Sequence, residues 1–275
     1  MLTILSPSKS LDFSSKLPTR KHTEPRLHDQ SMKLVEMLRQ QSPRDLAALM
    51  NISETLAELN VERYQEFDPE PTVENARPAV FAFNGDAYQG MDPQSFTARD
   101  ITEAQKTLRI LSGMYGVLRP LDLIQPHRLE MGTRLKTERG SSLYDWWGTQ
   151  VTDLVLEDLA TSPGSNTLIN LASKEYSSAL NMKKLQTRVI VPRFEDEDAQ
   201  GNLKVISFFA KRARGAMAAW IIRGRLRSPR ALLDFAQDGY EFAPELSTSD
   251  QPVFVRPYGF TPPPAPAHPN ARPSR

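Results

Sequence analysis

Charged side chains directly follow three short apolar runs in this sequence, in the position where α/β proteins commonly bind ligands. The runs are 2–5, 79–83 and 167–171, and the charged residues that follow them are Lys9, Asp86, Lys174 and Glu175. Lysines at such strand ends suit an anionic group such as phosphate, and carboxylates suit general acid–base chemistry. A surface ion pair, for example between Lys9 and Asp12, explains the same residue types equally well.

A fourth apolar run, 108–111, leads into the stretch 111–132, which fits neither a helical nor a strand period. Large leucines alternate there with six polar side chains: Arg119, Asp122, Gln125, His127, Arg128 and Glu130. We interpret the stretch as a loop that its leucines anchor and that presents polar groups into a cleft. Arg119 and Arg128 are then candidates for phosphate contact. Glu130 joins Asp86 and Glu175 as a candidate catalytic carboxylate. The alternative is an irregular connection in which both arginines merely pair with neighbouring carboxylates.

The longest run of one charge sign is basic: residues 204–230 carry eight basic side chains and no acidic one. Apolar spacing predicts a helix over about 210–225 within this run. Basic residues flank the apolar stripe of that helix, Lys211, Arg214 and Arg225 on one side, Arg212 and Arg223 on the other. A solvated helical face normally mixes charge signs. We therefore expect Lys211, Arg212 and Arg214 to contact phosphate, although a solvated face remains the simpler alternative.

Two short helices are predicted within about 43–67. Ser42 followed by proline is a typical helix start, and Ser53 can cap the second helix. The connection 49–53 resembles a helix-hairpin-helix element, in which exposed backbone amides bind a phosphate. Asn51 and Ser53 stand where that motif has glycines, and asparagine tolerates the left-handed backbone region. An ordinary helical hairpin explains the same residues.

The remaining periodic segments complete a mixed α/β pattern. Further helices are expected over 27–40, 96–107 and 144–159, and further strands over 188–194, 203–209 and 253–255. Tyr88 is expected to face outward with Asp86 at the end of the strand 79–83. Residues 259–275 contain Pro-Pro-Pro-Ala-Pro, which predicts a disordered tail.

Composition narrows the class of function. The 275 residues are 39% hydrophobic with a formal net charge of +1, so nucleic-acid binding would depend on local clusters of basic residues. The absence of cysteine removes thiolate metal sites and thiol nucleophiles and suits a reducing cytoplasm. We find no secretory signal and no run long enough to span a bilayer. The four histidines lack metal-binding spacing, so we expect no metal and no cofactor. No nucleotide-binding or hydrolase motif occurs, which weighs against enzyme activity and leaves it open.

Five separated blocks of sequence carry a family resemblance. They are 6–12 (Ser-Pro-Ser-Lys-Ser-Leu-Asp), 83–88 (Phe-Asn-Gly-Asp-Ala-Tyr), 111–123 (Leu-Ser-Gly-Met-Tyr-Gly-Val-Leu-Arg-Pro-Leu-Asp-Leu), 169–173 (Ile-Asn-Leu-Ala-Ser) and 206–215 (Ile-Ser-Phe-Phe-Ala-Lys-Arg-Ala-Arg-Gly). On these residues the chain resembles the YaaA family of bacterial peroxide-stress resistance proteins. The resemblance covers residues 1 to about 258, which we expect to form one domain.

The resemblance implies a single compact α/β domain, with a central mostly buried mixed sheet, surrounding helices, a basic cleft and a helix-hairpin-helix. It implies a cytoplasmic protein, induced by hydrogen peroxide, that binds double-stranded DNA and protects DNA and proteins by lowering unincorporated iron. The missing hairpin glycines weaken the expected phosphate contact there. We expect a monomer without membrane association. An enzyme acting on a phosphate-bearing small molecule or a nucleic-acid end, and direct iron sequestration, are the alternatives.

Overall fold

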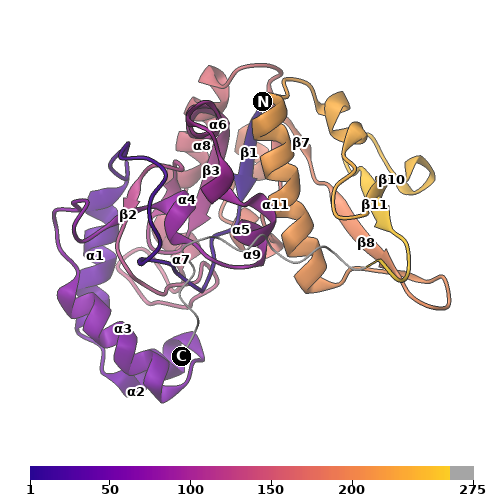
Figure 1. The fold of residues 1–275 in the computed structure, drawn as a ribbon. Helices are drawn as coiled ribbons and strands as arrows, with labels where there is room; N and C mark the ends of the chain where they lie inside the picture. The colour runs from indigo at the N-terminus through magenta and orange to yellow at the C-terminus, as the bar shows by residue number, and fades with distance from the viewer. Residues whose placement is uncertain (261–275) are drawn as a thin grey trace.

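The centre of the molecule is a five-stranded mixed sheet in the strand order β4-β3-β1-β6-β7 (Figure 1). The computed structural model describes residues 1–260, so most of the predicted proline-rich tail lies outside the described residues. The strands are β1 (Leu2–Leu5), β3 (Leu108–Ser112), β4 (Gly116–Leu118), β6 (Thr167–Asn170) and β7 (Arg188–Ile190). β1 pairs in parallel with β3 and β6, β6 pairs in parallel with β7, and only β4 runs antiparallel. β1, β3 and β6 are fully buried, as their apolar runs predict.

Two smaller sheets complete the β structure. One contains β8 (Arg193–Glu197), β9 (Leu203–Lys204), β10 (Glu241–Phe242) and β11 (Val253–Arg256), and the other contains β2 (Arg77–Pro78) and β5 (Leu123–Ile124). The four-stranded sheet lies on the far side of α11 from the α1–α3 lobe in Figure 1. Its interior holds a buried ion pair, in which Arg256 donates to Asp196 at 2.6 Å and Tyr240 donates to the same carboxylate at 3.0 Å.

The helices surround the central sheet and form a separate lobe at the indigo end of the chain (Figure 1). The α-helices are α1 (His28–Arg39), α2 (Pro43–Met50), α3 (Glu54–Glu66), α4 (Ala79–Ala82), α5 (Asp86–Met91), α6 (Ala98–Thr107), α7 (Leu143–Trp147), α8 (Gln150–Thr161), α9 (Lys174–Ser177), α10 (Met182–Leu185) and α11 (Ser207–Gly224). Single 3₁₀ turns are η1 (Pro93–Ser95) and η3 (Pro244–Leu246), and η2 (Pro229–Asp234) is longer. The result is the predicted mixed α/β fold in one compact domain.

Local capping residues determine where several helices begin, as the sequence predicts. Ser42 accepts a hydrogen bond from the Asp45 amide, and the Asp45 carboxylate accepts one from the Ser42 amide, which completes a capping box at α2. Thr97 caps α6 in the same way. Ser53 caps α3, and Asn51 ends α2 in the left-handed conformation with φ 51°. The predicted pair of helices within 43–67 is therefore confirmed, with the expected left-handed asparagine between them.

Several predicted elements are wrong. The run 79–83 forms the short buried helix α4 and not a strand, because a five-residue apolar run fits either element. Tyr88 does not face outward; α5 turns it into the core, where its hydroxyl donates to the Ser6 carbonyl at 3.1 Å. The segment 203–209 is a strand only at its start, since α11 begins at Ser207. Gly148, at φ 49°, divides the predicted helix 144–159 into α7 and α8.

Two glycines allow α5 and α11 to pack at backbone contact. A Cβ atom placed on Gly215 of α11 would lie 1.7 Å from the Ala87 carbonyl oxygen, and one on Gly90 of α5 would lie 2.0 Å from the Arg212 carbonyl oxygen. No side chain fits between the two helices at these points. The start of α5, which carries Asp86, therefore lies against the first half of α11.

Candidate ligand-binding cleft

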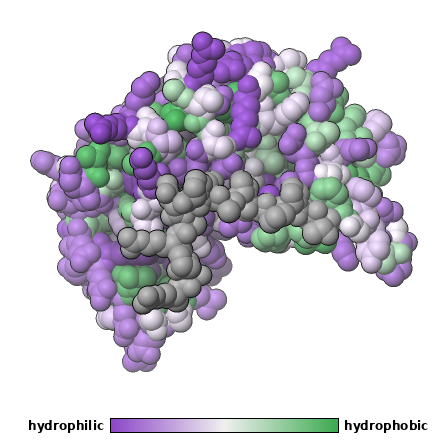
Figure 2. Space-filling view, in the orientation of Figure 1, coloured by the Kyte–Doolittle hydropathy of each residue, from purple (hydrophilic) through white to green (hydrophobic). Residues whose placement is uncertain are grey.

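A cavity of about 310 Å³ lies at the carboxyl ends of the central parallel strands. Its walls come from the end of β1 and the loop after it (5–10), the start of α5 (85–88), the segment after β6 (171–176) and α11. Figure 2 shows the molecule hollowed on this side, between the lobe of α1–α3 and the lobe of the four-stranded sheet. We call this cavity the strand-end pocket.

The strand order explains why the pocket is at this place. From β1 the chain reaches β3 on one side of it, and later β6 on the other side. The connections that leave neighbouring strands β1 and β6 thus diverge at their carboxyl ends, which leaves a crevice between them. Such reversal points are the usual ligand sites of open α/β sheets. Lys9, Asp86 and Glu175, which follow apolar runs in the sequence, all line this pocket.

Three basic side chains line the strand-end pocket, and two of them have no carboxylate partner among residues 1–260. Lys9 is already paired, since its ammonium lies 2.7 Å from Glu130. Lys211 is exposed on α11 and forms no ion pair within the described chain. Arg214, one turn further along α11, is partly buried, and burial lowers its pKa below the ordinary arginine value. Arg214 therefore carries a charge that is removed from water without a compensating acid from the described part of the chain.

Three carboxylates line the same pocket, so its formal charge is balanced. Glu130 accepts from Lys9 and, at 3.1 Å, from Arg128. Glu175 accepts from the Gly132 amide at 2.9 Å. Asp86, the first residue of α5, has no hydrogen-bond or ion-pair partner within the described chain. Two of the candidate catalytic carboxylates are therefore held in place, and Asp86 is available to a ligand.

The α2–α3 connection lies beside the same pocket. A second, more open hollow is lined by 48–51 and by Arg134, and it shares Glu130 and Glu175 with the strand-end pocket. Asn51 thus reaches the cleft, as the sequence interpretation requires. Ser53 is exposed, and its hydroxyl accepts from the Leu56 amide at 3.4 Å.

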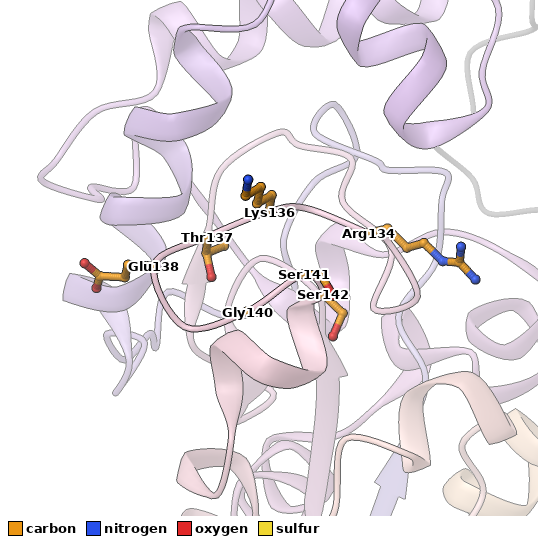
Figure 3. Close-up of a pocket in the computed structure, with 7 residues that line it drawn as sticks. All are labelled: Arg134, Lys136, Thr137, Glu138, Gly140, Ser141 and Ser142. Carbon is orange, nitrogen blue, oxygen red and sulfur yellow. The ribbon is translucent and has the colours of Figure 1, made fainter.

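A third hollow extends the cleft along the loop 134–142, which Figure 3 shows in close-up. Side chains alternate along the preceding segment, with Thr133 and Leu135 buried and Arg134 and Lys136 exposed. Arg134 and Glu138 point in opposite directions from this loop in Figure 3. Arg134 lines both the second and the third hollow, and Glu130 and Glu175 line both the first and the second, so the three hollows follow one another in a row.

Arg119 and Arg128 do not line the strand-end pocket, which corrects the interpretation that the stretch 111–132 presents both of them into a cleft. Arg119 donates to Asp122 at 2.9 Å and to the Glu24 carbonyl, because Asp122 is fully buried and requires a counter-ion. Arg128 pairs with Glu130, and its carbonyl accepts from Tyr64 of α3. Of the polar side chains in 111–132, only Glu130 reaches the pocket. The alternative of internally paired arginines describes both residues correctly.

His127 belongs to the core. It is buried edge-on against Tyr115, with ring centroids 5.2 Å apart, and its Nδ1 is 2.7 Å from the Gln125 carbonyl. Burial lowers the pKa of His127 from 6.5 to about 4, so the ring is neutral at physiological pH and donates to that carbonyl. Within residues 1–260 no group of three or more His, Cys, Asp or Glu side chains is arranged to hold a metal ion.

The basic run 204–230 does not form one free basic face. Acidic residues from elsewhere pair with four of its eight basic members: Lys204 with Asp198, Arg212 with Asp238, Arg225 with Asp100 and Arg227 with Glu103. Arg212 is thus held at 2.9 Å from Asp238 on the side of α11 facing the four-stranded sheet, and it does not line the pocket. Of the three residues expected to contact phosphate, Lys211, Arg212 and Arg214, the first and the last remain candidates. Lys174 is exposed at the start of α9 and lies outside the pocket lining.

Comparison with known families and proteins identifies the family of the chain. The family model of the peroxide stress protein YaaA matches residues 1–246. The chain belongs to this family. It is 52% identical over 257 residues to a UPF0246 protein of Tolumonas auensis, and the aligned residues make up 94% of the chain and 98% of that relative. A UPF0246 protein of Idiomarina loihiensis is 50% identical over 256 residues, which make up 93% of the chain and 98% of that relative. A UPF0246 protein of Alcanivorax borkumensis is 48% identical over 257 residues, which make up 94% of the chain and 99% of that relative.

Sequence reasoning missed several residues of this YaaA-family cleft. Arg134 and Lys136 were not among the predicted site residues, although their positions on either side of Leu135 indicate that both face solvent if the segment is extended. Ser173, whose amide donates to Ser6 at 2.9 Å, ties the two strand-end loops together. Tyr176 lines the pocket beside Glu175, and burial raises its pKa well above the ordinary tyrosine value. No described helix is long and apolar enough to cross a bilayer.

Proposed function

We propose that this YaaA-family protein acts in the peroxide-stress response by binding nucleic acid, double-stranded DNA in particular, along the cleft between α11 and the α2–α3 connection. The observation that carries the proposal is Arg214, a partly buried arginine that lines the strand-end pocket without a carboxylate partner in residues 1–260. An arginine in this state is stabilised by a bound anion, and phosphate matches the donor geometry of its guanidinium.

Four free basic residues follow the cleft from one end to the other. Lys211 and Arg214 line the strand-end pocket, Arg134 lines the two adjoining hollows and Lys136 lines the last. None of the four forms an ion pair within the described chain. Asn51 lies at the same cleft in a left-handed conformation, and its amide and that of Ile52 donate to the Ala47 carbonyl at the end of α2. A phosphate backbone lying along this path would meet a positive charge in each hollow.

The salt dependence of binding tests this path. About four phosphate contacts predict that log K against log[salt] has a slope of about −3.6, whereas an intact face of eight basic residues would give about −7. Binding to a fluorescent duplex is measured by anisotropy between low and moderate salt. Lys211→Glu with Arg214→Glu abolishes most of the binding. The matched control is Lys33→Glu with Lys106→Glu, two exposed helical lysines outside the cleft, with the same change of net charge. Equal loss in both double variants contradicts the assignment of the cleft.

By its family the protein is further proposed to be a cytoplasmic monomer that lowers unincorporated iron and so protects DNA and proteins from peroxide. This part rests on family membership alone. Its test is the chelatable iron pool, measured by electron paramagnetic resonance in peroxide-treated cells with and without the protein. An unchanged pool in cells that lose peroxide resistance contradicts the iron role and leaves the DNA role intact.

A second candidate function is catalysis on a phosphate-bearing small molecule or a nucleic-acid end. The observation that favours it is the presence of Asp86, Glu130 and Glu175 in one pocket with Arg214. Carboxylates beside an arginine in a cleft are suited to general acid–base work. Incubation with phosphorylated oligonucleotides, followed by mass spectrometry of the products, tests it. No turnover by the native protein after long incubation contradicts this candidate.

A further inference from the structure

The strand-end pocket is too small for a duplex and large enough for one nucleotide. Its volume of about 310 Å³ lies at the lower end of the range for small-molecule sites. Two loops close one side of it. A Cβ atom on Gly85 would lie 2.3 Å from the Ser8 hydroxyl, so glycine is required for that hydroxyl to stay at the pocket wall. Whatever enters the pocket is therefore a single group that protrudes from a larger ligand, or a small ligand itself.

The free charges of the pocket match a dianion better than a monoanion. Lys211 and Arg214 supply two positive charges that form no ion pair within the described chain. A phosphate monoester carries about −1.5 to −2 charges at neutral pH, whereas an internal phosphodiester of nucleic acid carries one. The guanidinium of Arg214 presents parallel N–H donors to two phosphate oxygens, and a serine hydroxyl from the loop after β1 can donate to a third.

One carboxylate of the pocket is left to contact the rest of such a ligand. Glu130 is occupied by Lys9 and Arg128, and Glu175 by the Gly132 amide. The Asp86 side chain has no partner within the described chain, and a carboxylate can only accept hydrogen bonds. A sugar hydroxyl or a base N–H group next to the phosphate supplies the donor it lacks. A bare anion does not, and Asp86 repels it.

We propose that the strand-end pocket binds the terminal phosphate monoester of a nucleic-acid strand, with Arg214 and Lys211 on the phosphate and Asp86 on the adjoining nucleoside. The site deepens the proposed nucleic-acid binding and rests on it. Strand ends that carry a phosphate are then bound more tightly than either internal duplex or ends that carry only hydroxyl groups. The 5′-phosphate and the 3′-phosphate share this chemistry, and the experiment separates them.

The test compares three labelled duplexes of one sequence, with short single-stranded overhangs that end in a 5′-phosphate, a 3′-phosphate or hydroxyl groups only. With the native protein, one phosphorylated end binds at least about tenfold more tightly than the hydroxyl ends, as two charge-assisted contacts provide. Arg214→Gln removes that preference, and Arg214→Lys keeps part of it. Lys106→Gln, an exposed lysine on α6 with the same change of charge, keeps all of it. The native comparison needs no variant, so it stands even if Arg214→Gln fails to fold.

Calorimetric titration with nucleoside monophosphates, nucleosides and inorganic phosphate separates this site from the proposed function. Phosphate-dependent binding of the monophosphate without any binding of DNA supports the pocket and contradicts the DNA proposal. Equal binding of phosphorylated and hydroxyl ends, together with binding of duplex DNA, overturns the terminal-phosphate site and leaves the DNA proposal standing. Binding of inorganic phosphate as tight as that of the monophosphate removes the role of Asp86. Absence of all binding contradicts both.

Discussion

Replacing Gly215 with alanine tests whether the contact between α5 and α11 holds the site together. The new Cβ would lie 1.7 Å from the Ala87 carbonyl oxygen, where ordinary carbon–oxygen contacts are about 3.3 Å, so the two helices must separate by roughly 1.6 Å. Overpacking costs about 1–3 kcal/mol, and a backbone carbonyl cannot rotate away, which favours the upper end. The better helix propensity of alanine returns about 1 kcal/mol. The expected net loss of unfolding free energy is about 2 kcal/mol.

Urea unfolding followed by circular dichroism measures this loss, and Gly224→Ala is its matched control. Gly224 lies in the same helix, but its added Cβ would meet only the Leu226 side chain, at 2.9 Å, and that side chain can move. We expect Gly224→Ala to change stability by less than about 1 kcal/mol. Because separation of the helices moves Asp86 away from Arg214, Gly215→Ala also weakens DNA binding at temperatures where it remains folded. Equal stability of the two variants would refute the packing argument.

Three further predictions concern stability. Arg256→Met leaves Asp196 buried with only Tyr240 as donor and lowers the free energy of unfolding by about 3 kcal/mol in urea titrations; a loss below 1 kcal/mol would contradict it. The folded-state pKa of His127 is about 4, below its unfolded value of 6.5. The buried neutral ring therefore contributes to the free energy of unfolding fully above pH 6.5, and up to about 3 kcal/mol of stability is lost as pH falls toward 4. The free energy of unfolding should therefore fall more between pH 7 and pH 4.5 in the native protein than in His127→Gln. An equal fall in both proteins would exclude a buried neutral histidine. Ser42→Ala removes the α2 capping box and costs about 1 kcal/mol in thermal unfolding. Ser249→Ala is the neutral control, since Ser249 is exposed and its hydroxyl forms no hydrogen bond within the described chain.

The elements that could be predicted from sequence are those whose signals are local. Ser42 with Pro43 and Asp45 specifies the start of α2 within four residues, and Asn51 provides the left-handed end of that helix. The buried strands β1, β3 and β6 follow from apolar runs flanked by polar breakers. The run 79–83 has the same composition, yet it forms a helix. Its backbone groups bond to the 120–122 segment and not to a neighbouring strand, a choice that depends on tertiary contacts.

The charged partners of the site could not be predicted, because pairing depends on residues far apart in the chain. Arg227 pairs with Glu103, 124 positions away, and Arg212 pairs with Asp238, 26 positions away. A segment without acidic residues does not form a basic surface where the fold places acidic residues from other segments beside it. Lys211 and Arg214 differ from these arginines in forming no ion pair within the described chain, and no local pattern encodes that absence.

The balance of charge in the strand-end pocket changes what kind of binding the cleft can perform. A basic groove attracts any polyanion through its net field, but three cations beside three carboxylates produce little net field. Affinity then depends on a few directed contacts, and a phosphate that does not reach Arg214 meets the carboxylates of Asp86 and Glu130 instead. Such repulsion toward wrong placements is what discriminates between ligands of one class. The carboxylates that reduce general affinity for DNA therefore increase selectivity for a ligand whose phosphate fits between Lys211 and Arg214.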